Sequence, residues 1–227
     1  GLIATGLDTP ALFLILAVAN ALVTVWVCKL LPQDVLRMLT RALLRGAYRV
    51  EVTGLENCAA AGDRVIVVPN HVSFIDAPLI AAFLPGSPVF AIDPGQMRRW
   101  WVRPFLAAVD VFPVDPSRPM ATKSLIKAIR EGSRCVIFPE GRLNVTGGAL
   151  MKVYDGPALI ADKGDAQVLP VRIDGVEFTA FSRLRGRLRR RWFPKITITL
   201  YEPRRLAIPV ELRGRARRQR AGTGEGV

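Results

Sequence analysis

Short apolar runs alternate with helix-length segments through most of this 227-residue chain. We interpret seven runs as strands, at residues 48–53, 65–68, 89–92, 109–114, 134–138, 167–173 and 195–201. We interpret five other segments as helices, at residues 33–47, 79–84, 96–107, 119–130 and 156–163. The segment 54–63 is expected to be a loop. Parallel strands need long crossover connections, so this alternation predicts an α/β fold with a mostly parallel sheet flanked by helices. The threonines that alternate along 195–201 predict a more exposed final strand.

The N-terminal region carries an uncharged stretch from Ala11 to Cys28. Because about 20 apolar residues cross a bilayer core, this stretch predicts a transmembrane helix, with a buried core helix as the alternative. Asp8 precedes the stretch and several basic residues follow it, so the positive-inside rule places the C-terminal side in the cytoplasm. The chain begins at Gly1 rather than Met, and we interpret it as part of a longer protein.

These patterns divide the chain into three parts. We expect a transmembrane helix in residues 1–33, an α/β domain in 34–205 and a basic, disordered tail in 206–227. The segment 33–47 is amphipathic, with Arg37, Arg41 and Arg45 along one side. We expect it to lie at the membrane surface with these arginines at the level of the lipid phosphates, or to pack on the domain with a solvated face.

The net charge of +13 and the isoelectric point near 10.8 predict anionic partners. Lipid headgroups, nucleic acid and an acidic carrier protein all qualify, and the densest basic segment runs from Arg183 to Lys195. Trp100 and Trp101 stand among arginines and are expected either to reach a lipid interface or to pack in the core. Three cysteines and one histidine show no metal-ligand spacing, so we expect no metal and no other cofactor.

The single histidine, His71, stands where the strand 65–68 gives way to a turn. Asp76 follows five positions later, just before Pro78 and an apolar segment, and we interpret it as the N-cap of a helix. A strand-to-helix turn would bring the imidazole and the carboxylate together. A carboxylate on one ring nitrogen fixes the tautomer and leaves the other nitrogen free to act as a base.

A second turn follows the strand 134–138 and carries Glu140, Gly141 and Arg142, with Lys152 further on. Because it begins at a strand end, we expect it at the same edge of the sheet as His71. Free backbone N–H groups and an arginine suit an anion. A base, a carboxylate that orients it and a basic pocket together suit acyl transfer from a thioester to an alcohol that carries a phosphate.

The sequence offers two other candidate nucleophiles, Ser73 and Cys135. Ser73 lies two residues from His71, which permits a Ser-His-Asp hydrolase, although no G-x-S-x-G elbow occurs. Cys135 could carry an acyl group, but its place in an apolar strand favours inert packing.

Two ordered motifs resemble those of the glycerolipid acyltransferases, the group of the 1-acylglycerol-3-phosphate acyltransferases. The stretch 70–76 is similar to NHxSxxD, also written HX4D, and 138–141 is similar to FPEG. The stretch 168–171 resembles a proline-centred block of the same family, and the whole resemblance spans residues 35–205. Within the family, the chain is similar to the acyltransferase domain of the bacterial 2-acylglycerophosphoethanolamine acyltransferase/acyl-carrier-protein synthetase, in stretches 69–76, 112–116, 138–142, 146–147, 150–156 and 181–184.

This resemblance implies that His71 is the general base and Asp76 its partner. It also implies that Glu140, Gly141 and Arg142 surround the phosphate and glycerol of the acceptor. We add four substrate-binding candidates from neighbouring positions, which are Asn70, Ser73, Arg118 and Lys152.

Two positions depart from the family pattern. Arg142 stands where members carry a threonine after the glycine, and Asp115 stands where many carry an arginine, with Arg118 nearby. Both departures favour a lysophospholipid with a headgroup larger than a bare phosphate.

We therefore expect a lysophospholipid acyltransferase that moves a fatty acyl group from acyl carrier protein or coenzyme A to a 2-acylglycerophosphoethanolamine-like lipid. The alternatives are a 1-acylglycerol-3-phosphate acyltransferase and a non-catalytic basic module that binds lipid or nucleic acid. The expected location is the bacterial inner membrane, with the catalytic domain on its cytoplasmic face, and nucleic acid is not the expected partner. The resemblance also implies a fused or associated lysophospholipid transporter and acyl-carrier-protein synthetase.

Overall fold

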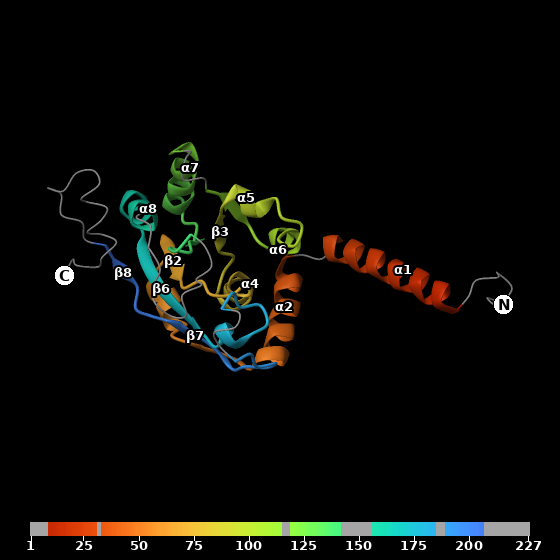
Figure 1. The fold of residues 1–227 in the computed structure, drawn as a ribbon. Helices are drawn as coiled ribbons and strands as arrows, with labels where there is room; N and C mark the ends of the chain where they lie inside the picture. The colour runs from red at the N-terminus through yellow and green to blue at the C-terminus, as the bar shows by residue number, and fades with distance from the viewer. Residues whose placement is uncertain (1–8, 31–32, 115–118, 142–155, 185–188, 207–227) are drawn as a thin grey trace.

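The computed structural model describes residues 9–30, 33–114, 119–141, 156–184 and 189–206 (Figure 1). The strands are β1 (Val50–Thr53), β2 (Val65–Pro69), β3 (Val89–Ile92), β4 (Val111–Pro113), β5 (Cys135–Val136), β6 (Gln167–Asp174), β7 (Ile196–Leu200) and β8 (Arg204–Arg205). The helices are α1 (Thr9–Leu30), α2 (Gln33–Tyr48), α3 (Glu56–Ala60), α4 (Asp76–Phe83), α5 (Pro94–Met97), α6 (Arg103–Ala108), α7 (Pro119–Arg130) and α8 (Gly156–Gly164), with a 3-10 turn η2 (Val176–Phe178).

The strands form one sheet in the order β1-β7-β6-β2-β5-β3-β4, and β8 pairs with β6. Strands β6, β2, β5, β3 and β4 are parallel, β1 and β7 are parallel to each other, and the β6–β7 pair is antiparallel. The prediction of an α/β fold with a mostly parallel sheet is confirmed. The prediction of an exposed final strand is wrong, because β7 lies between β1 and β6 and buries Ile196, Ile198 and Leu200. Its threonines alternate with these residues and are half-buried on the other face.

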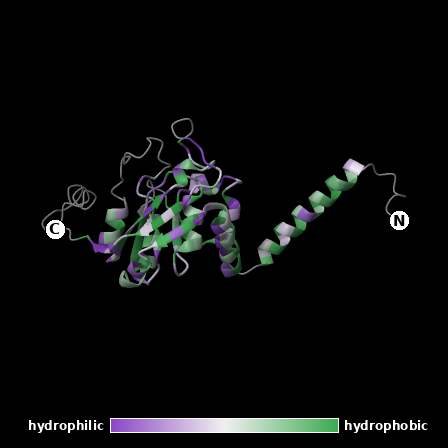
Figure 2. Cartoon of the chain, turned by 90° about the horizontal axis from the view of Figure 1, so that it is seen from below, coloured by the Kyte–Doolittle hydropathy of each residue, from purple (hydrophilic) through white to green (hydrophobic). Residues whose placement is uncertain are grey.

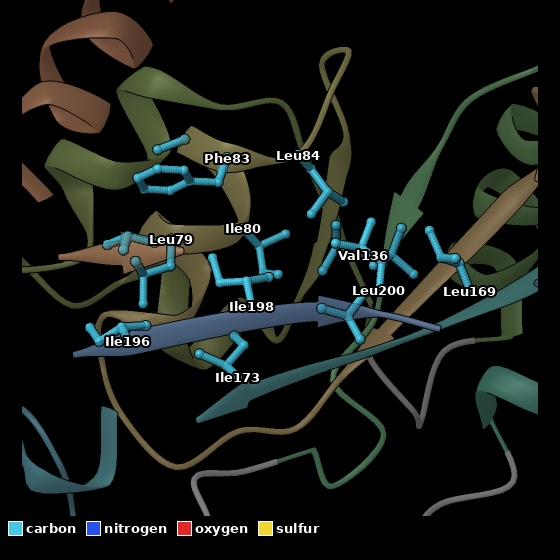
Figure 3. Close-up of a cluster of buried hydrophobic side chains, with 14 of the residues drawn as sticks. Leu79, Ile80, Phe83, Leu84, Val136, Leu169, Ile173, Ile196, Ile198 and Leu200 are labelled. Carbon is cyan, nitrogen blue, oxygen red and sulfur yellow. The ribbon is translucent and has the colours of Figure 1, made fainter. Parts of the chain in front are cut away.

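Hydrophobic clusters lie on the two faces of the sheet. One cluster joins α4 to the sheet through Leu79, Ile80 and Phe83, which pack with residues of β6 and β7 (Figure 3). The other joins α7 and α8 to Ile66 and Cys135. Ile66 belongs to the second cluster and its neighbours Val65 and Val67 to the first, as the alternating side chains of a strand require. The sheet is therefore covered by helices on both faces around β2, which positions the residues that follow it.

Two connections differ from prediction. The expected helix 96–107 is two short helices, because Pro104 has no N–H to continue a helical ladder and α6 starts afresh beside it. Asp93 caps α5 by accepting from the N–H groups of Gly95 and Gln96 at 2.8 and 3.2 Å. The expected loop 54–63 contains α3.

Helix α1 stands clear of the α/β body (Figures 1 and 2). Among the described residues, it is the one helix long and apolar enough to cross a membrane, and none of its 9–27 span is buried. The length and composition of this helix suggest membrane association. The hydrophobic colouring in Figure 2 runs along most of α1.

Helix α2 packs with its arginine row against α4, so the prediction that these arginines lie at phosphate level is wrong for this structure. Arg37 donates to the carbonyls of Leu84 and Gly86, and Arg41 Nε donates to Ala82 O at 2.7 Å. The last carbonyls of a helix have no partner within it, which explains why guanidinium groups gather there. Elsewhere on its surface, α2 exposes three large apolar side chains, which are Met38, Leu39 and Leu43.

Candidate active site

The two turns singled out from the sequence meet at one edge of the sheet. His71 follows β2, and Glu140 follows β5 by four residues. Because β2 and β5 pair in parallel, both turns leave the sheet at its carboxyl edge, as predicted. The His71 N–H lies 3.5 Å from Glu140 Oε1, and the His71 and Phe138 rings stack with centroids 4.1 Å apart.

His71 and Asp76 form a direct pair. Nδ1 of His71 lies 3.0 Å from Asp76 Oδ2. A carboxylate at this position stabilises the tautomer with the proton on Nδ1, which leaves the Nε2 lone pair as the acceptor. The His71 side chain is 20% exposed whereas that of Asp76 is fully buried, so substrate can reach the imidazole but not the carboxylate.

Asp76 organises the whole turn rather than capping α4. Its Oδ2 accepts from the N–H groups of Val72 at 2.7 Å and Ser73 at 2.8 Å, in addition to the His71 ring. The N-cap of α4 is Ile75, and no side chain caps it, so the predicted Asp76 cap is wrong. Burial raises the pKa of Asp76, while the hydrogen bond and charge of His71 and the two N–H donors oppose that rise.

The Glu140 turn is built by the backbone of residues 138–141. Gly141 N–H donates to Phe138 O at 3.1 Å, and Gly141 has a φ of +62°, a conformation that favours glycine. The Glu140 side chain is buried beside His71, and its Oε2 has no hydrogen-bond partner among the described residues. Buried polar atoms are normally paired, so this oxygen needs a partner that the described residues do not supply.

Two of the predicted substrate contacts bind the protein itself. The Asn70 amide donates to Ile173 O at 2.9 Å and accepts from Ile173 N–H at 2.7 Å, which ties the end of β2 to β6. Ser73 is fully buried, with its hydroxyl 3.5 Å from that of Thr179. That either residue touches substrate stays a prediction. Arg118, Arg142 and Lys152 lie outside the described residues.

A segment that the sequence analysis did not connect with the site, residues 176–184, closes over the His71 turn. Phe74 N–H donates to Phe181 O at 3.2 Å, and Arg183 N–H donates to Val72 O at 3.3 Å. Ser73 and Ser182 form an isolated antiparallel bridge. The contacts involve backbone atoms and join residues about 110 positions apart, so no local sequence pattern predicts them. The resemblance at 181–184 was the one sequence signal in this segment.

The structure argues against Ser73 and Cys135 as nucleophiles. A Ser73 nucleophile would need His71 as its base, whereas the Ser73 hydroxyl lies 3.5 Å from the Thr179 hydroxyl and 3.5 Å from Ile75 N. Cys135 is buried in β5, and burial raises the pKa of its thiol to about 12, so the reactive thiolate is negligible at neutral pH. Within the described part of the chain, no three His, Cys, Asp or Glu side chains are grouped to hold a metal ion.

A protein-family model described as Acyltransferase matches residues 49–174, which is more than half of the chain. The chain belongs to the Acyltransferase family. The matched region of this acyltransferase contains the His71–Asp76 pair and the Glu140 turn, and it ends just before the 176–184 segment.

Two further relatives were found. The chain is 24% identical over 135 residues to the chloroplastic 1-acyl-sn-glycerol-3-phosphate acyltransferase LPAT1 of Arabidopsis thaliana, covering 56% of this chain and 36% of the plant protein. It thus spans about a third of that relative's length. The crystal structure of the 1-acyl-sn-glycerophosphate acyltransferase PlsC of Thermotoga maritima is similar with a TM-score of 0.56 and 23% identity, over 85% of this chain and 78% of that one. This likeness shows a common fold.

Proposed function

We propose that this acyltransferase moves a fatty acyl group from a thioester to the free hydroxyl of 1-acylglycerol-3-phosphate, with His71 as general base. The observation that carries the proposal is the partly exposed imidazole of His71, whose Nδ1 is 3.0 Å from Oδ2 of the fully buried Asp76 carboxylate. An imidazole held in this way has one nitrogen free to remove a proton near neutral pH.

The proposed reaction needs one base and no covalent enzyme intermediate. Nε2 of His71 removes the hydroxyl proton as the acceptor oxygen bonds to the thioester carbonyl carbon. The tetrahedral species then collapses, the carbon–sulfur bond breaks, and the thiolate leaves and takes the proton from the imidazolium. Asp76 stabilises the imidazolium while it exists. The proposal assigns Glu140, whose Oε2 has no partner among the described residues, to bind the glycerol part of the acceptor.

The acceptor is inferred from charge and from the relatives. Arg142 and Lys152 follow the Glu140 turn in the sequence, and the net charge is +13. The two relatives are named for 1-acylglycerol-3-phosphate, which supports this acceptor over the 2-acylglycerophosphoethanolamine expected from the sequence. The larger acceptor remains the second candidate because Arg142 and Asp115 depart from the family pattern.

The proposal includes a donor and a location. The donor is a fatty acyl thioester of acyl carrier protein or coenzyme A. Helix α1 anchors the chain in the bacterial inner membrane with the α/β domain on the cytoplasmic face, as the basic residues after α1 favour. Association with a lysophospholipid transporter and an acyl-carrier-protein synthetase would follow only if 2-acylglycerophosphoethanolamine is the acceptor.

The test pairs both donors with both acceptors and measures thiol release by the purified full chain in mixed micelles. We expect release with 1-acylglycerol-3-phosphate, and a loss of about 10²-fold or more in His71→Ala because general base catalysis contributes 10² to 10⁴. Lys127→Ala, an exposed change on α7, serves as the control and retains activity.

Unchanged turnover in His71→Ala would remove the mechanism. Faster turnover of 2-acylglycerophosphoethanolamine would replace the acceptor. Binding of anionic lipid without thiol release from any pair would leave the non-catalytic module.

A further inference from the structure

Large aromatic side chains are exposed around the turn that carries His71. Phe74 is 38% exposed, Trp101 40%, Phe181 48% and Trp100 80%. The Phe74 and Trp101 rings meet edge to face with centroids 4.9 Å apart, and the Phe181 carbonyl accepts from Phe74 N–H. The turns at 74, 100–101 and 181 therefore form one surface. A contiguous apolar surface of this kind marks an interaction site in a folded protein.

Arginines lie over two of these rings. The Arg183 guanidinium is 5.7 Å from the Phe74 ring centroid, and that of Arg99 is 6.0 Å from Trp101. Within the described residues, neither arginine forms an ion pair. We name this surface the arginine–aromatic rim, and it consists of Phe74, Arg99, Trp100, Trp101, Phe181 and Arg183.

The rim lies beside the point where α1 joins the α/β body. Trp101 and Gln33, the first residue of α2, line the same cavity of about 340 Å³ between α2, α4 and α6. Figure 1 shows α1 leaving the body next to α6. The candidate membrane span and the rim are thus neighbours, and a bilayer that receives α1 would reach the rim as well.

Tryptophan and arginine suit the lipid–water interface. Indole rings concentrate there because one end is apolar and the other polar, and arginine reaches the phosphates of anionic lipids. A symmetric contact between two copies of this chain would instead bring the rim arginines together. The charge of the rim therefore favours an anionic lipid surface over a second copy.

We propose that the arginine–aromatic rim is a membrane contact in addition to α1, and that it lies in the interface of an anionic phospholipid monolayer. Phe74 belongs to the His71 turn, and its N–H donates to Phe181 O. Contact of the rim with the membrane would therefore set the depth of His71 relative to the lipid. A lysolipid acceptor could then be reached without leaving the monolayer. The inference goes beyond the proposed function and depends on contacts outside the His71–Asp76 pair.

The test uses the tryptophans of the full chain. Trp26→Phe with Trp192→Phe leaves Trp100 and Trp101 as the two indoles. This variant is reconstituted in vesicles of phosphatidylcholine and phosphatidylglycerol, with and without bromine on acyl carbons 6 and 7 of the phosphatidylcholine. We expect emission to fall by about twofold or more with brominated lipid, because interfacial indoles lie next to the upper acyl carbons.

The matched control places an indole on the far side of the sheet. Leu55→Trp, in a chain whose four native tryptophans are phenylalanine, lies beyond β1, at the opposite edge from β4, and residue 55 is 41% exposed. Brominated lipid should leave its emission unchanged. Equal quenching at both positions, or no quenching of Trp100 and Trp101, would overturn the proposal.

Charge variants test the choice of partner. Arg99→Glu with Arg183→Glu should weaken the quenching of Trp100 and Trp101, and the two lysine substitutions should retain it. Protection of these indoles from iodide by single-stranded oligonucleotide, or by raised protein concentration without lipid, would overturn the membrane assignment. Repeating the measurement in His71→Ala separates its outcome from that of the activity test, because fluorescence does not require turnover.

Discussion

At the scale of single residues, the site depends on a carboxylate that the fold takes out of water. Asp76 is fully buried, and its Oδ2 accepts three hydrogen bonds while Oδ1 has no partner among the described residues. An asparagine with its oxygen in the Oδ2 position would keep the three bonds and remove the charge, while its NH2 group would occupy the buried Oδ1 position at a cost that does not depend on pH. The charge is therefore separable from the geometry, which makes Asp76 the most informative position for substitution.

Asp76→Asn should change how stability depends on pH. A carboxyl whose pKa is raised by folding binds its proton more tightly in the folded state, so its contribution to stability is greatest below the unfolded pKa and is lost as pH rises through the folded pKa. Asp76→Asn removes this loss. We expect the melting temperature of the variant, minus that of the native chain, to increase from pH 4 to pH 8. A difference that stays constant or decreases over this range would contradict the burial argument.

At the scale of elements, the site is a pair of turns at strand ends, and each turn depends on contacts that hold its backbone. Gly141 has the left-handed φ that closes the turn after β5. Thr179, in the segment after η2, donates from Oγ1 to Val176 O at 2.7 Å and lies 3.5 Å from the Ser73 hydroxyl. These residues touch neither reacting atom and act by positioning those that do.

Gly141→Ala should destabilise the chain by about 1–2 kcal/mol, because the left-handed conformation is unfavourable for a residue with a Cβ atom. Thiol release should fall as well, since the turn holds Glu140 beside His71. Gly46→Ala is the matched control: Gly46 lies inside α2 with open space where its Cβ would be, and the change should stabilise the helix by about 0.5–1 kcal/mol. Urea unfolding measures both. Equal effects at the two glycines would show that the turn needs no glycine.

Thr179→Val should cost about 0.5–1.5 kcal/mol of unfolding free energy, because it removes the hydrogen bonds of the Thr179 hydroxyl to Val176 O and to the Ser73 hydroxyl. Both atoms keep a backbone N–H partner, from Thr179 and Ile75 respectively. Thr53→Val removes an exposed hydroxyl on β1 and should be nearly neutral. If urea unfolding finds the two variants alike, the 176–184 segment contributes little to holding the His71 turn.

At the scale of the whole molecule, the sequence predicted the features that depend on local pattern. The strand–helix alternation predicted the α/β fold, and the placement of His71 and Glu140 after buried strands predicted that their turns share one edge of the sheet. The orientation of α2, the interior position of β7 and the packing of 176–184 on the His71 turn were not predicted. Each depends on a partner segment about 40 or more residues away, which is β1 in the case of β7. Periodicity says which face is apolar without saying what covers it.

The central claim is that His71 and Asp76 act together on one proton, and a double-mutant cycle on thiol release tests it most directly. The rates of His71→Ala, Asp76→Asn and the double variant are compared with that of the native chain, using 1-acylglycerol-3-phosphate as acceptor. If Asp76 acts only through His71, the double variant should be no slower than His71→Ala alone. Losses that multiply in the double variant would show that the two residues contribute independently, and would contradict the account.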